Sequence, residues 1–128
     1  MSIKYKVIPR GEPGVPGGGV EKYYASAKTT GTVNIDELTT AIEKISTVSG
    51  ADIRAVLYAL VDVATDELAK SNIVRLGDLG SMRVSISSNG RNNSDSVNAT
   101  AIKGSRILFS PGKRLKNMQK TLTYEKIE

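Results

Sequence analysis

The feature that most restricts the fold is a run of ten residues without an apolar side chain, SSNGRNNSDS at residues 87–96. It follows the alternating segment SMRVSIS and precedes the strand-like segment RILF. Alternation of apolar and polar residues is typical of a strand with one buried and one solvated face. We therefore expect two strands joined by a polar finger that buries nothing in its own chain.

Two helices are predicted before this finger. Asn34 and Glu37 form a capping-box pattern, and the apolar residues that follow predict a helix over about 35–46. Ser49 starts a second capping pattern, which predicts a helix over roughly 50–70. An apolar stripe along the second helix indicates core packing and comprises Ile53, Val56, Leu57, Leu60, Val61, Ala64 and Leu68.

After the second helix the pattern becomes extended. Residues 73–76 predict a strand, and the alternating strand that follows places Arg83 on its wet face. A long return strand is predicted over 97–109. Ser110 and Pro111 then predict the N-cap and first position of a short basic helix. This order predicts an α+β fold with a three-stranded antiparallel sheet.

The N-terminal segment 1–33 predicts an extension made of a strand, a Pro- and Gly-rich loop and a second strand. Its strands are expected over 4–8 and 22–28. The main domain is expected over 34–122, and residues 123–128 are expected to be a C-terminal tail.

The composition argues against an enzyme. The chain of 128 residues contains no Cys and no His, which removes the commonest general base and the commonest metal ligands. We expect no catalysis, no cofactor and no small-molecule substrate, and we interpret the acidic helix residues Asp62, Asp66 and Glu67 as a solvated face. Because no segment is apolar enough to span a bilayer and the N-terminus is charged, no membrane partner and a cytoplasmic location are expected.

Charge is unevenly distributed. Residues 1–80 carry nine basic and ten acidic side chains, whereas residues 81–128 carry nine basic and three acidic ones. This asymmetry indicates either a polyanionic partner of the last third or a solvated basic tail. The 39% hydrophobic content, with one Phe and no Trp, predicts a thin core that a partner chain would complete.

Three motifs resemble those of the bacterial histone-like proteins HU and integration host factor. They are LGDLGSMRV at 76–84, GRN at 90–92, and FSPGK at 109–113 followed by Leu115-Lys116. They appear in the order and near the spacing of the family, and the resemblance covers about residues 34–120. The extension before the first helix resembles the long-N-terminus branch of this family.

The resemblance implies an intertwined homodimer with two helices per chain at its base and a saddle of sheets. Two β-arms would then reach around double-stranded DNA, as expected of an architectural, nucleoid-associated protein that condenses DNA with little sequence preference. The residues expected to contact DNA are Arg83, Arg91, Asn92, Asn93, Lys103, Arg106, Lys113, Arg114 and Lys116.

Some positions depart from the family pattern. Asn93 stands where the family has its tip proline, and a polar amide is a poor wedge between base steps, so weaker or smoother bending of DNA is predicted. Arg91 is the one basic residue in 85–102. The alternative is therefore a dimeric scaffold of the same fold that docks another protein and has weak or lost DNA binding.

Overall fold

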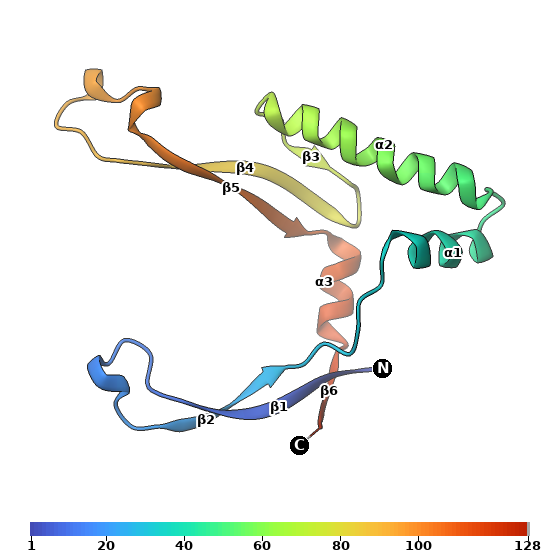
Figure 1. Cartoon of the computed structure of the whole chain (residues 1–128), viewed down its shortest axis with the longest axis horizontal. Helices are drawn as coiled ribbons and strands as arrows, with labels where there is room; N and C mark the ends of the chain where they lie inside the picture. The colour runs from blue at the N-terminus through green and yellow to red at the C-terminus, as the bar shows by residue number, and fades with distance from the viewer. Residues whose placement is uncertain (128) are drawn as a thin grey trace. The chain divides into compact units, whose positions relative to one another are not determined.

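The computed structural model describes residues 1–127 and consists of two compact units. One unit comprises Met1–Asn34 together with the residues from Met118 onward, and the other comprises Ile35–Asn117. The described residues form three α-helices and two three-stranded sheets, with strand orders β2-β1-β6 and β3-β4-β5 (Figure 1). The α+β class predicted from the sequence is confirmed.

Both predicted N-terminal helices are present in the second unit. Helix α1 spans Ile35–Ile45 and α2 spans Gly50–Ala69. The Ser49 hydroxyl accepts a hydrogen bond from the Asp52 backbone N–H at 3.3 Å, which confirms the predicted N-cap of α2. Glu43 Oε2 also accepts from the Gly50 backbone N–H at 2.6 Å, so two side chains satisfy donors at this helix start.

The three-stranded sheet of this unit is antiparallel, as predicted. It contains β3 (Val74–Arg75), β4 (Gly80–Ser88) and β5 (Ile102–Pro111). Directly paired residues share a face, so Met82 and Val84 lie with Phe109 and Ile107 on an apolar face. The other face carries the polar residues of β4. The β4–β5 hairpin extends beyond the helices of its own unit (Figure 1).

Two predicted boundaries in this region are wrong. Residues 97–101 are not part of the return strand, because Asn93 and Asn98 cap the short 3-10 helices η2 (Ser94–Ser96) and η3 (Ala99–Ala101). The final helix does not begin at Pro111, which still pairs with Gly80 in the sheet. Helix α3 instead spans Lys113–Lys120.

The first unit is built on the predicted N-terminal hairpin, whose strands β1 (Ser2–Arg10) and β2 (Lys22–Ala27) are antiparallel. The segment predicted as a C-terminal tail contains strand β6 (Thr123–Lys126), which pairs in parallel with the start of β1. Sequence patterns did not indicate this pairing, because its partners are more than 100 positions apart. The predicted domain boundaries themselves stay a prediction.

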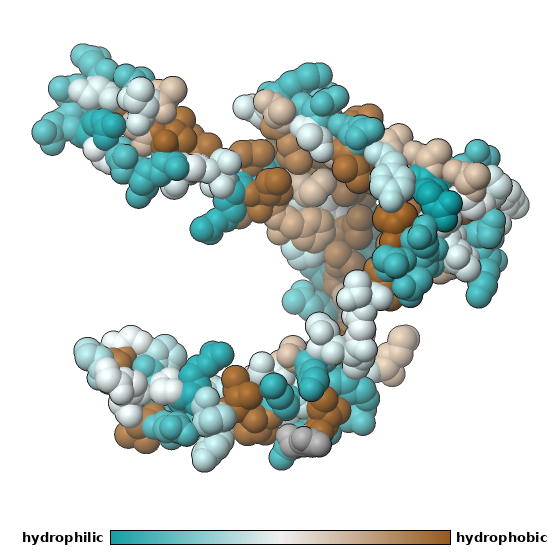
Figure 2. Space-filling model, in the orientation of Figure 1, coloured by the Kyte–Doolittle hydropathy of each residue, from teal (hydrophilic) through white to brown (hydrophobic). Residues whose placement is uncertain are grey.

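The core within one chain is small. Among the described residues only Ile53, Ala64 and Ala101 are buried apolar side chains, with Thr39 as a buried polar one. Only part of the apolar stripe predicted on α2 is covered, since Val56 is 65% exposed and Leu60 is 41% exposed. Figure 2 shows apolar side chains at the surface of the helical unit. The single chain therefore leaves much of its apolar surface in contact with water.

Candidate nucleic-acid interface

One arginine from each strand of the β3-β4-β5 sheet lies on its polar face. Arg75 pairs with Ser81, and Arg106 pairs with Ser85, so both share a face with Arg83, which lies between these serines in β4. The three positions form a diagonal row, and such neighbours have Cα atoms about 7–8 Å apart. We call Arg75, Arg83 and Arg106 the arginine face.

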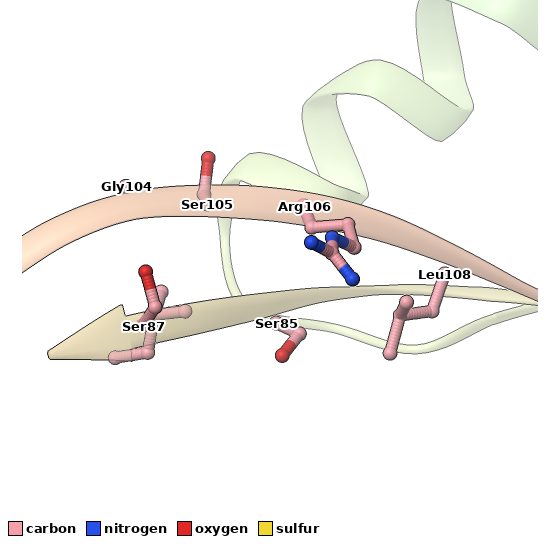
Figure 3. A pocket seen from close by; sticks show the side chains of 7 residues that line it. Ser85, Ser87, Gly104, Ser105, Arg106 and Leu108 are labelled. Atoms are coloured by element: carbon pink, nitrogen blue, oxygen red, sulfur yellow. The ribbon is translucent and has the colours of Figure 1, made fainter. Parts of the chain in front are cut away.

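Arg106 lines a shallow depression of about 330 Å³ on this part of the hairpin. Figure 3 shows Ser105 projecting to one side of the ribbon, while Ser85 and Leu108 project to the other. The lining comprises three serines, a glycine, the Arg106 guanidinium and the aliphatic side chains of Ile86 and Leu108. Small hydroxyl residues leave the guanidinium accessible, and a hydroxyl can donate a hydrogen bond to a phosphate oxygen.

Arg75 was not among the residues predicted from the sequence. It lies in residues 1–80, whose summed charge is negative, so the charge distribution along the sequence did not indicate Arg75 as a phosphate contact. The register of β3 against β4 provides the missing signal, because Val74 pairs with Met82 on the apolar face and Arg75 therefore points the other way. Arg75 also lines a second depression of about 330 Å³ together with Lys116 of α3.

The start of α3 is held closely against the turn before β4. The Gly112 backbone N–H donates to Leu79 O at 2.9 Å, and the Lys116 N–H donates to Gly112 O at 3.0 Å. A Cβ on Gly112 would lie 2.9 Å from the Gly80 nitrogen and closer still to the Asp78 backbone. This tight approach positions three exposed cations at the start of the helix: Lys113, Arg114 and Lys116.

The tip of the β4–β5 hairpin is ordered by its own side chains. Asn93 Oδ1 accepts from both the backbone N–H and the hydroxyl of Ser96, at 3.1 and 3.0 Å. Asn98 Oδ1 likewise accepts from the Thr100 N–H at 3.0 Å. The Asn89 N–H donates to Ala101 O at 2.8 Å and closes the base of the loop. The Asn93 carbonyl oxygen is therefore occupied, and its amide NH₂ remains as a donor.

The remaining predicted residues lie along the same hairpin. Arg91 and Asn92 are exposed at the tip, and Arg91 Nη1 donates to the Gly90 carbonyl oxygen at 3.3 Å. Lys103 lies beside the irregularity in register between Ser87 and Ser88, so strand alternation does not assign it to the arginine face. All nine predicted residues are exposed.

The cations of this surface form no ion pair with other side chains of residues 1–127. Within residues 1–127, ion pairs join Lys4 to Glu125, Lys22 to Glu12, Arg54 to Asp36 and Lys70 to Glu67, and none involves the seven predicted cationic residues or Arg75. Unpaired surface cations keep their full attraction for an external anion. The arrangement is therefore suited to binding several phosphate groups at once.

The comparisons with known proteins assign the family. Residues 1–126 match the family model HU-HIG, described as an HU domain fused to wHTH, Ig, or Glycine-rich motif. The chain belongs to the HU-HIG family. This match confirms the resemblance to HU that the three motifs indicated.

A solved structure from Bacteroides vulgatus ATCC 8482, described as a candidate bacterial DNA-binding protein, shares the fold. It aligns with a TM-score of 0.69 at 12% sequence identity and covers 98% of this chain. The HU-HIG chain spans 48% of that protein's length. None of the curated proteins matches the sequence.

Across residues 1–127, no group of three or more His, Cys, Asp or Glu side chains is placed to hold a metal ion. No helix in this part of the chain is both long and apolar enough to cross a membrane.

Proposed function

We propose that this HU-HIG protein is an architectural DNA-binding protein that holds duplex DNA with little preference for sequence. The observation that carries the proposal is the arginine face, which takes one unpaired cation from each strand of a single sheet. Such a face suits a regular array of phosphates, because it presents charges at repeating positions on a rigid support. The cations at the start of α3 would extend this surface.

Low sequence preference follows from the chemistry of these groups. Phosphate contacts contribute affinity through counterion release and carry no base information directly. At the hairpin tip, Arg91 and the amides of Asn92 and Asn93 suit the minor groove, where donors distinguish few base pairs. No apolar wedge is available at Asn93, so the proposal includes smooth bending rather than a sharp kink. Such a protein would act at the nucleoid, without catalysis, cofactor or small-molecule substrate.

The proposal also includes an intertwined homodimer. On α2, Val56, Leu60 and Val63 have the spacing of one helical face and are 65, 41 and 60% exposed. On the sheet, Ile107 and Phe109 are 65 and 49% exposed. Monomeric soluble proteins seldom leave so much contiguous apolar surface in water. A second copy covering these faces would complete the core and double the number of cations facing the duplex.

The test is a titration of a labelled random-sequence duplex at several salt concentrations. For wild type, log K should fall linearly with log salt at a slope of about −0.9 per phosphate contact. A variant with Arg75→Gln, Arg83→Gln and Arg106→Gln should bind more weakly and show a slope shallower by about 0.9 for each phosphate that it no longer neutralises. The control is Lys44→Gln with Lys126→Gln, which removes two cations that are not members of the arginine face.

The opposite result would assign a different role. If wild type binds the duplex weakly and without salt dependence, and still forms a dimer, the fold serves as a scaffold for another protein. The low charge of the hairpin tip, where Arg91 is the one basic residue of 85–102 and Asp95 is acidic, is the observation that favours this second function.

A further inference from the structure

The sheet of the N-terminal unit has two chemically different faces. Ile3, Tyr5 and Val7 of β1 lie on one face with Ala25 of β2 and Tyr124 of β6. The opposite face carries Lys6, paired with Ser26, and Arg10, paired with Lys22. We call Lys6, Arg10 and Lys22 the extension face. It was not predicted from the sequence, because the acidic helices that follow cancel its charge in the sum over residues 1–80.

The charge of this face is concentrated toward the hairpin loop. At the other end of β1, Lys4 forms an ion pair with Glu125 and is thereby neutralised. Lys6 and Arg10 are in no ion pair within the described residues, and Lys22 has only a distant contact with Glu12, with Nζ and Oε1 3.9 Å apart. Three exposed cations therefore lie along one sheet face between the middle of β1 and the hairpin loop, and of these only Lys22 forms an ion pair within the described residues.

The direct pairing of Arg10 with Lys22 is unfavourable in the free protein. Like charges that lie opposite each other across an antiparallel pair repel and destabilise the sheet. A local arrangement that lowers stability without a structural benefit is expected at functional sites. An external anion between these two side chains would remove the repulsion, so the pair itself indicates an anionic ligand.

The spacing of the cations fits an extended polyanion better than a single small anion. Lys6 and Arg10 are four residues apart on a strand, which corresponds to about 13 Å. This distance is the axial rise of about four base pairs along one DNA strand. Between them, the half-buried pair Ile8 and Tyr24 fills the face and supports the flanking side chains.

We propose that the extension face is a second DNA-binding surface, which contacts the phosphate backbone of a duplex through Lys6, Arg10 and Lys22. This inference rests on the proposed function for its choice of polyanion. It predicts that the N-terminal extension adds phosphate contacts to those of the arginine face, and it assigns a role to a segment that lies outside the three HU motifs.

The experiment compares three double variants of the full chain in the salt titration. Lys6→Gln with Arg10→Gln should give a slope shallower by about 0.9 for each phosphate left without its cation. Lys44→Gln with Lys126→Gln removes the same charge and should leave the slope unchanged; Lys126 pairs with Tyr5 and lies on the opposite face of the same sheet. Arg83→Gln with Arg106→Gln reports on the arginine face independently.

The outcomes separate the two proposals. A normal slope for the Lys6 and Arg10 variant, with a shallower slope for the Arg83 and Arg106 variant, would overturn this inference and leave the proposed function intact. A shallower slope for the Lys6 and Arg10 variant, with a normal slope for the Arg83 and Arg106 variant, would support the extension face as a DNA-binding surface and contradict that role for the arginine face. Wild type without salt-dependent binding would overturn both. Binding to anionic phospholipid vesicles that requires Lys6 and Arg10, with a normal DNA slope, would assign the face to lipid instead.

Stability provides a second readout. Because Arg10→Gln removes the repulsion with Lys22, the Lys6 and Arg10 variant should unfold at the same temperature as wild type or at a higher one in the absence of DNA. Circular dichroism during heating measures this directly. A lower unfolding temperature would show that these cations stabilise the free protein. That result would contradict the proposal that they are present to bind an external anion.

Discussion

At the scale of single residues, Gly112 explains why the FSPGK motif has a glycine. Its Cα lies so close to the backbone of Asp78 and Gly80 that no side chain fits between them. The contact joins the end of β5 to the turn before β4, and it sets the position at which α3 and its cations begin. The glycine of the motif is thus required for packing. The lysine that follows it is placed at the start of α3 by this close contact.

We predict that Gly112→Ala destabilises the fold by about 1–3 kcal/mol, the usual effect of forcing extra volume into a packed site. The Cβ would meet backbone atoms, which cannot rotate away as a flexible side chain can. Urea unfolding followed by circular dichroism measures the change. Gly104→Ala is the matched control, because a Cβ there has no neighbour within 4 Å and Gly104 lies in a strand of the same sheet. Equal midpoints for the two variants would contradict the prediction.

At the scale of elements, local signals determined how well the sequence predicted the structure. Helices α1 and α2 were predicted to within one residue at each end, because caps such as Ser49 lie next to the residues that they satisfy. The return strand was predicted five residues too early, since Asn98 caps a turn of 3-10 helix inside an apparently extended segment. Strand β6 was missed because its partner β1 is at the far end of the chain.

The same distinction applies to the candidate site. Period-two alternation is a local property, and it indicated the wet face for Arg83; that Arg106 shares this face follows from the register of β4 against β5. Arg75 and the extension face were missed, because their positions depend on the register between strands and on which neighbours lack a counterion. The register of two strands is set by pairing between residues that can be far apart in the sequence. The summed charge of a segment gives no information about that register.

The attachment of β6 to β1 should depend on pH. Hydrogen bonds from Lys4 and Ser2 to the Glu125 carboxylate, and the charge of Lys4, lower the pKa of Glu125 from its ordinary value. A carboxyl group with a lowered pKa in the folded state stabilises that state at neutral pH. The contribution is complete above about pH 4.3, the ordinary value for Glu, and is lost as pH falls through the lowered value.

We therefore predict that β6 detaches more readily in acid than at pH 7. Amide hydrogen exchange in Thr123–Lys126, corrected for the intrinsic effect of pH, should show protection falling below about pH 4.3. Glu125→Gln keeps hydrogen-bonding oxygen but cannot titrate, so its protection should be lower at pH 7 and nearly independent of pH. A pH-dependent loss of protection in this variant equal to that of wild type would contradict the assignment to Glu125.

At the scale of the whole molecule, the described residues of one chain bury few apolar side chains. The largest buried side chain among residues 1–127 is Ile53, and none of the described aromatic residues is buried. Small domains depend on their core for most of their stability, and the proposed second copy would enlarge that core by covering the exposed apolar faces. Stability and dimerisation are therefore expected to be a single property of this protein.

We predict that Val56→Asp with Val63→Asp disrupts the dimer and lowers stability together, because both charges would enter an apolar contact between copies. Size-exclusion chromatography with light scattering should show a dimer for wild type and a monomer or unfolded chain for the variant. The midpoint of urea unfolding of wild type should also rise with protein concentration. Val20→Asp, at an exposed loop position, should behave as wild type.

A stable monomer whose unfolding is independent of concentration would contradict this prediction, even if the variant also folds normally. In that case the apolar faces of α2 and of the sheet would remain exposed to water in a stable monomer.

The parallel pairing of β1 with β6 has a consequence for the order of folding during synthesis. The β1–β2 hairpin contains contacts between residues close in sequence, and such contacts form early. Strand β6 follows β1 by more than 100 positions, so the edge of β1 that pairs with it stays open until those residues have been synthesised. The β1–β2 hairpin therefore forms before β6 completes its sheet.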